Sequence, residues 1–113
     1  MAKIQIKNKE RVRFYNMQKE YGDLDRARET RIIRHELIDK LSEQQKADRG
    51  ISLNAFGVYV ASEEMAENVT DMTLTGESLE VFKAFIARTS EEQKVFYLDE
   101  PLFRQILEMQ PDK

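Results

Sequence analysis

The segment DLDRARETRIIRHELIDKLSEQQKADRG, residues 23–50, is the part of the chain that decides the fold. Asp23 is a typical N-cap, because a short carboxylate accepts the unpaired amide protons of a first helical turn. Lys46 and Gly50 are typical of a helix end. Six apolar residues recur between these ends, namely Leu24, Ala27, Ile33, Leu37, Ile38 and Leu41. The segment therefore predicts one long helix over residues 23–49.

Residues 1–22 form an N-terminal arm for which two alternatives stay open. Two stretches, 3–7 and 11–14, alternate apolar with polar residues, which predicts a short β-hairpin. The competing interpretation begins a helix near Lys9, with Phe14 and the apolar residues that follow it on one side.

Residues 52–110 are predicted to be a region of short helices. Ser52 can cap a helical stretch that includes Phe56, although residues 57–60 could instead form a strand. Residues 68–76 are rich in Thr, Asp and Gly and lack helical periodicity, which predicts a loop.

Further helices are predicted toward the C-terminus. Residues 77–88 carry an apolar stripe at helical spacing. Ser90 and Gln93 have the spacing of a capping box, so another helix is expected to start there. Pro101 suits the first turn of a last helix, where its missing N–H has no partner to lose. The chain is thus predicted to be mostly α, with four to five helices in one small domain over residues 1–113.

Composition limits the class of protein. The chain has 113 residues, of which 41% are hydrophobic and 35% charged, which suits one domain with a small core and a wetted surface. It has no cysteine, so disulfides and thiolate metal sites are excluded and a reducing cytosol fits best. No run of about 18 apolar residues exists, so we expect a cytoplasmic protein and no membrane partner.

No catalytic, cofactor-binding or metal site is predicted. His35 is the only histidine, and the motif HELID at residues 35–39 lacks the second histidine of a zinc protease. No Gly-x-Ser-x-Gly turn is present to position a serine nucleophile. The four glycines do not have the spacing of phosphate-binding or dinucleotide-binding loops. These absences favour a binding protein over an enzyme.

The two halves of the chain carry opposite net charge. Residues 1–49 hold 13 Lys and Arg against 9 Asp and Glu, a net charge of +4. Residues 50–113 hold 5 against 12, a net charge of −7. Such polarity can orient an encounter with a charged partner or let copies stack head to tail. We therefore expect a homo-oligomer.

Eight side chains of the basic half form a predicted basic patch: Lys7, Lys9, Arg11, Arg13, Arg26, Arg28, Arg31 and Arg34. Because phosphate contacts need such a stripe, a nucleic-acid-binding regulator is the alternative function. The four helical arginines, however, spread over about 200° at 100° per residue, and the chain is acidic, with a pI of about 5.3. Nucleic acid is therefore the less favoured partner.

The C-terminal part of the chain is dense in large apolar side chains. Most are expected in the core, but two short helices offer little area to cover them all. Some are therefore expected to line a groove for an amphipathic helical partner protein. The predicted partner-binding residues are Phe82, Phe85, Phe96, Phe103, Ile106 and Leu107.

The opening MAKIQIKNK, residues 1–9, followed by short capped helices in an acidic chain of this length, resembles the tail assembly chaperones of long-tailed bacteriophages. The resemblance implies a protein that is absent from the finished virion. Such a protein coats the hydrophobic tape-measure protein and keeps it soluble until tail-tube subunits polymerise around it. Self-association along this helical client is implied as well.

Overall fold

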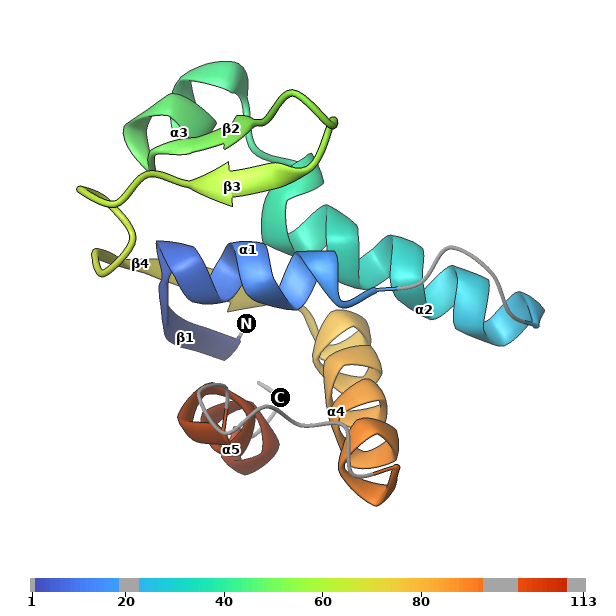
Figure 1. The fold of residues 1–113 in the computed structure, drawn as a ribbon. Coiled ribbons are helices and arrows are strands. Elements are labelled where there is room, and N and C mark those ends of the chain that lie inside the picture. Colours follow the sequence, from blue (N-terminus) through green and yellow to red (C-terminus); the bar gives the residue numbers. More distant parts are fainter. Residues whose placement is uncertain (1, 19–22, 93–99, 110–113) are drawn as a thin grey trace.

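The structure, a computed structural model, describes residues 2–18, 23–92 and 100–109 (Figure 1). Its elements in chain order are β1 (Ala2–Lys7), α1 (Asn8–Asn16), α2 (Leu24–Arg34), a π-helix (His35–Asp39), α3 (Glu43–Asp48), β2 (Ile51–Leu53), β3 (Tyr59–Ala61), β4 (Val69–Leu74), α4 (Gly76–Glu91) and α5 (Glu100–Glu108). The described residues thus hold five α-helices and two two-stranded sheets. The prediction of a mostly α fold with four to five helices is confirmed.

Strands β1 and β4 pair with each other although they lie far apart in the sequence. They run antiparallel, with Ile4 opposite Met72, and both side chains are buried together with Ile6. The loop predicted over residues 68–76 is therefore wrong. This segment contains β4, although it is rich in polar residues. Met72 and Leu74 point into the core and alternate with more exposed neighbours.

Residues 11–14 lie in α1, so the predicted second arm of an N-terminal hairpin is wrong and the helical alternative is confirmed. Helix α1 starts directly after β1, and hydrogen bonds cap its first turn. The amide N–H of Lys7 donates to the Glu10 carboxylate at 2.8 Å, and the amide N–H of Asn8 donates to the Asn68 carbonyl at 3.0 Å. These bonds satisfy donors that a helix start would otherwise leave unpaired.

The long helix predicted over residues 23–49 is interrupted at residues 40–42, so the prediction of one continuous helix is wrong. Its start is confirmed, because the Asp23 carboxylate accepts the amide proton of Arg26 at 2.9 Å. The π-helix and a short turn follow α2, and the Ser42 side chain then caps α3 as a separate helix. In Figure 1, α3 accordingly lies beside the β2–β3 hairpin and does not extend α2.

The buried side chain of Arg11 supports this interruption. It is 1% exposed, and its guanidinium donates to the Leu37 carbonyl at 2.6 Å and to the Thr70 hydroxyl at 3.3 Å. Carbonyl groups at a helix end lack partners within the helix, so a charged donor is well placed there. Burial, aided by nearby Arg49, lowers the pKa of Arg11 to about 10, which leaves it charged at neutral pH. One side chain thereby joins α1, the π-helix and β4.

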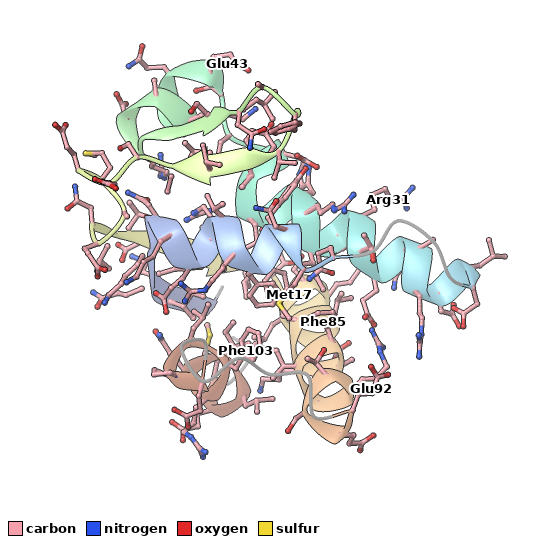
Figure 2. All side chains as sticks on the ribbon, viewed as in Figure 1. Met17, Arg31, Glu43, Phe85, Glu92 and Phe103 are labelled. Carbon is pink, nitrogen blue, oxygen red and sulfur yellow. The ribbon has the colours of Figure 1, made fainter. Side chains whose placement is uncertain are left out.

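The core lies between α1, α2, α4, α5 and the inner face of the β1–β4 sheet. Phe14 of α1 is at its centre, with ring centroids 5.4 Å from Phe82, 5.6 Å from Phe85 and 5.1 Å from Phe103. Figure 2 shows Phe85, Phe103 and Met17 in the space between α1, α4 and α5. An aromatic side chain from the N-terminal part of the chain thus covers those of the C-terminal helices.

Residues 51–61 form the β2–β3 hairpin, so the helix predicted from Ser52 is wrong. The strand alternative for residues 57–60 is confirmed in part, since β3 begins at Tyr59. The region 52–110, predicted as short helices, therefore also contains strands.

The last two helices follow the prediction more closely. Helix α4 confirms the helix over residues 77–88 but continues through Ser90, which therefore is not an N-cap. Gln93, the other half of the predicted capping box, lies outside the described residues. Helix α5 confirms the last predicted helix, with Pro101 in its first turn.

Candidate binding surface on the β2–β3 hairpin

Most of the predicted partner-binding residues that the structure describes lie in the core. Phe82, Phe103 and Ile106 are buried, and Phe85 is half-buried against Phe14. These side chains belong to the core, so their assignment as partner-binding residues is corrected. Leu107 alone among the described residues of this set is exposed, at 43%. Phe96 lies outside the described residues.

The predicted basic patch is likewise divided. Arg11 is buried, which removes it from any surface, and Arg34 donates to the Gln18 carbonyl at 3.0 Å while its guanidinium stacks over the Tyr15 ring. Arg13 is half-buried and Arg31 is exposed. The remaining four side chains, Lys7, Lys9, Arg26 and Arg28, form ion pairs. The eight residues therefore do not form one free basic surface.

These ion pairs connect the basic half of the sequence to the acidic half. Lys7 and Lys9 share the carboxylate of Glu67, and Arg28 pairs with Glu77. Arg26 and Glu92 approach to 3.9 Å, and Arg88 of the second half pairs with Glu29 of the first. Opposite charges of the two halves thus meet within one folded molecule.

Glu67 offers a test of this internal pairing. Hydrogen bonds from Lys9 and then Lys7 lower its carboxyl pKa from an ordinary 4.5 to about 2. Because the folded-state pKa lies below the unfolded value, the pairing stabilises the fold above about pH 4.5 and is lost as pH falls toward 2. An NMR titration of the Glu67 side-chain carbon should give a midpoint near 2, and Lys9→Ala should raise it. A wild-type midpoint at the ordinary value would contradict the pairing.

His35 belongs to the HELID motif, which lacks the second histidine of a zinc protease. It is exposed and lines a shallow cavity of about 300 Å³ with Arg31, Glu36 and Ser78. The Ser78 hydroxyl is 3.4 Å from Glu36, which also accepts from Lys40 at 2.8 Å. Within residues 2–18, 23–92 and 100–109, no three His, Cys, Asp or Glu side chains gather to hold a metal ion. None of the described helices has the length and apolar character needed to cross a membrane.

The β2–β3 hairpin is anchored to the domain on one face. Ile51 is buried, and the Tyr59 ring meets the Tyr15 ring edge-on at 5.2 Å. The side-chain amide of Asn16 donates to the Tyr59 carbonyl at 3.1 Å, and Lys46 donates to the Tyr59 hydroxyl at 3.2 Å. Because successive strand residues point to opposite faces, the residues next to Tyr59 project away from the domain.

Hydrogen bonds hold the loop of the hairpin in one conformation. The Asn54 side-chain oxygen accepts the amide protons of Phe56 at 2.8 Å and Val58 at 3.1 Å. The Asn54 amide donates to the Val58 carbonyl at 2.9 Å, and the Gly57 amide donates to the Asn54 carbonyl at 3.0 Å. Gly57 has a φ of +76°, which other residues rarely adopt. The loop is therefore organised by its own residues.

Apolar side chains are exposed on this hairpin. Phe56 at the tip is 90% exposed, Val58 43% and Val60 39%, and we call these three residues the hairpin patch. Leu53 is 58% exposed but lies opposite Tyr59 in the strand register, so it is on the other face of the hairpin. Val58 and Val60 alternate with Tyr59 and therefore share the outer face. Single exposed apolar residues are common, but several gathered on one element mark an interaction site.

One feature of the sequence indicates this hairpin, although a helix was predicted from Ser52. Residues 51–62 include no charged residue, in a chain of which 35% of the residues are charged. Asn54 and Gly57 are turn-forming residues set between two short apolar stretches, which is typical of a hairpin. The helical spacing of Leu53 and Phe56 after Ser52 masked this pattern.

Comparisons of the chain with protein-family models, curated proteins and solved structures found no match.

Proposed function

We propose that the chain is a non-enzymatic protein that binds a partner protein through the hairpin patch, with Phe56 as the anchor. The observation that supports this most strongly is the 90% exposure of Phe56 on a loop held by hydrogen bonds. Large aromatic anchors contribute much of the binding energy at protein interfaces. A loop that is already ordered also loses little conformational entropy on binding.

The most concrete partner is a helical client in the cytoplasm, as the resemblance to tail assembly chaperones implies. Under this proposal the hairpin patch takes the place of the C-terminal apolar residues as the surface that covers the hydrophobic tape-measure protein. Self-association along the client remains a prediction, and sedimentation of the complex over a range of concentrations would test it.

Co-expression with the tape-measure protein encoded in the same genome, followed by pull-down, tests this proposal. Phe56→Ser is expected to weaken binding by at least about 30-fold, the effect of losing an interface hot spot. Its free energy of unfolding should change by less than about 0.5 kcal/mol, because an exposed side chain stabilises the fold little.

Leu107→Ser is the matched control, because Leu107 is an exposed apolar residue on a different element, α5. This variant should bind like the wild type. Failure of the wild type to retain the tape-measure protein would contradict the proposed client. Equal binding by wild type and Phe56→Ser would contradict the role of the hairpin patch.

A further inference from the structure

The exposed charges at the base of the hairpin are acidic. Glu43 and Asp48 belong to α3, which leads into β2, and Glu63 and Glu64 lie in the turn that follows β3. All four residues are exposed, and we call them the acidic rim. Figure 2 shows Glu43 at the hairpin end of the molecule, away from Phe85 and Phe103.

The cations of the same region are engaged inward. The Lys46 side chain is only 14% exposed, because it packs over the Tyr59 ring and donates to the Tyr59 hydroxyl. It lies 3.6 Å from Glu43, whose side chain nevertheless remains 95% exposed. Arg49 is half-buried and donates to the Gln45 carbonyl at 3.1 Å. The surface at the base of the hairpin is therefore negative toward solvent.

Four acidic side chains elsewhere in the fold are neutralised by ion pairs. Glu29, Glu77 and Glu100 each pair with an arginine, and Glu67 pairs with two lysines. Glu63 and Glu64, by contrast, form no ion pair with any residue of the described ranges. Uncompensated charge beside an apolar patch attracts a partner of opposite charge and repels one of like charge.

We propose that the hairpin patch binds an amphipathic helix whose apolar stripe is flanked by Lys and Arg, with the cations facing the acidic rim. This inference rests on the proposed function and adds the chemistry of the partner. Val58 and Val60 lie along one side of the hairpin, and Phe56 lies in the turn beyond them. The apolar residues provide the contact, and the rim selects the charge and orientation of the helix.

Two synthetic peptides test this inference directly and do not require the natural partner. Both carry the same helical leucine stripe, and their polar face is Lys in one and Glu in the other. Titration into the full-length protein at low salt, followed by amide chemical shifts, should show the Leu/Lys peptide binding about tenfold more tightly. The shifts should centre on Phe56, Val58 and Val60, and the difference between peptides should shrink as salt rises.

Charge reversal at the rim supplies the controls. Glu63→Lys with Glu64→Lys should invert the peptide preference. The matched double variant Glu80→Lys with Glu108→Lys changes the net charge equally at exposed positions on α4 and α5, and should keep the wild-type preference. Thermal melts of both variants check that each is folded. Similar effects of the two double variants would overturn the inference, because net charge alone would then explain the preference.

The outcomes separate this inference from the proposed function. If Phe56→Ser weakens both peptides equally while the rim variant changes neither, the charge selection is overturned and the hairpin patch remains the binding site. If the wild type binds neither peptide, the helical basic partner is overturned, whatever the tape-measure pull-down shows. Binding of both peptides that is insensitive to Phe56→Ser would overturn the inference and the proposed site together.

Discussion

Arg11→Met is expected to lower the free energy of unfolding by about 3 kcal/mol. Methionine keeps most of the side-chain volume, so the loss comes chiefly from the hydrogen bonds to the Leu37 carbonyl and the Thr70 hydroxyl. The buried Leu37 carbonyl and the half-buried Thr70 hydroxyl would both lose their charged donor. The burial that lowers the Arg11 pKa to about 10 opposes the charge and offsets part of the loss. Urea denaturation of both proteins at neutral pH measures the difference.

Arg31→Met is the control for this prediction, because Arg31 is exposed on α2. Its stability should stay within about 0.5 kcal/mol of the wild type. If Arg11→Met were as stable as Arg31→Met, the guanidinium would not be needed to hold α1, the π-helix and β4 together.

Gly50→Ala is expected to lower the free energy of unfolding by about 2–4 kcal/mol and to disturb the base of the hairpin. Gly50 has a φ of +68°, a conformation that costs an alanine roughly 1 kcal/mol or more. An added Cβ would also lie 2.5 Å from the Ser62 hydroxyl and 2.7 Å from the Met65 Cβ. Both neighbours would have to move, and Ser62 directly follows β3. Denaturation and the amide spectrum of residues 51–61 measure the effect.

Gly57→Ala separates the two causes, because Gly57 has a φ of +76° but no atom within 4 Å of an added Cβ. Gly57→Ala should lower the free energy of unfolding by only about 1 kcal/mol, which is the part of the effect that comes from the backbone conformation. Equal losses for the two alanine variants would contradict the close packing assigned to Gly50.

The helices that the sequence predicted correctly are those with strong local signals. The Asp23 cap, the apolar stripe over residues 77–88 and Pro101 each act within a turn or two, so no distant contact is needed to recognise them. The interruption after Asp39 was harder to predict. A capping box at Ser42 and Gln45 was present, but the apolar periodicity continued across it and favoured one helix.

The sheet required information that local patterns do not contain. Strand β1 pairs with β4, more than 60 residues away. The alternation over residues 3–7 predicted a strand but could not identify this partner. Residues 68–76 are also rich in Thr, Asp and Gly, which are frequent in loops. Their strand conformation follows from pairing with Ile4 and Ile6.

The candidate site could not be predicted from counts of residues. Two short helices do offer little area for Phe82 and Phe103, but Phe14 of α1 supplies the missing cover. The net charge of each half of the chain likewise does not show which charged residues form ion pairs. Glu67 of the acidic half pairs with Lys7 and Lys9 of the basic half. Long-range contacts decide both outcomes.

A photoreactive phenylalanine analogue placed at position 56 tests the central claim most directly, because it crosslinks only to what touches the hairpin tip. A discrete protein adduct is expected from position 56 in the cell, and the same analogue at position 107 should not give it. Absence of an adduct from position 56, or the same adducts from both positions, would contradict the claim that this tip is the binding surface.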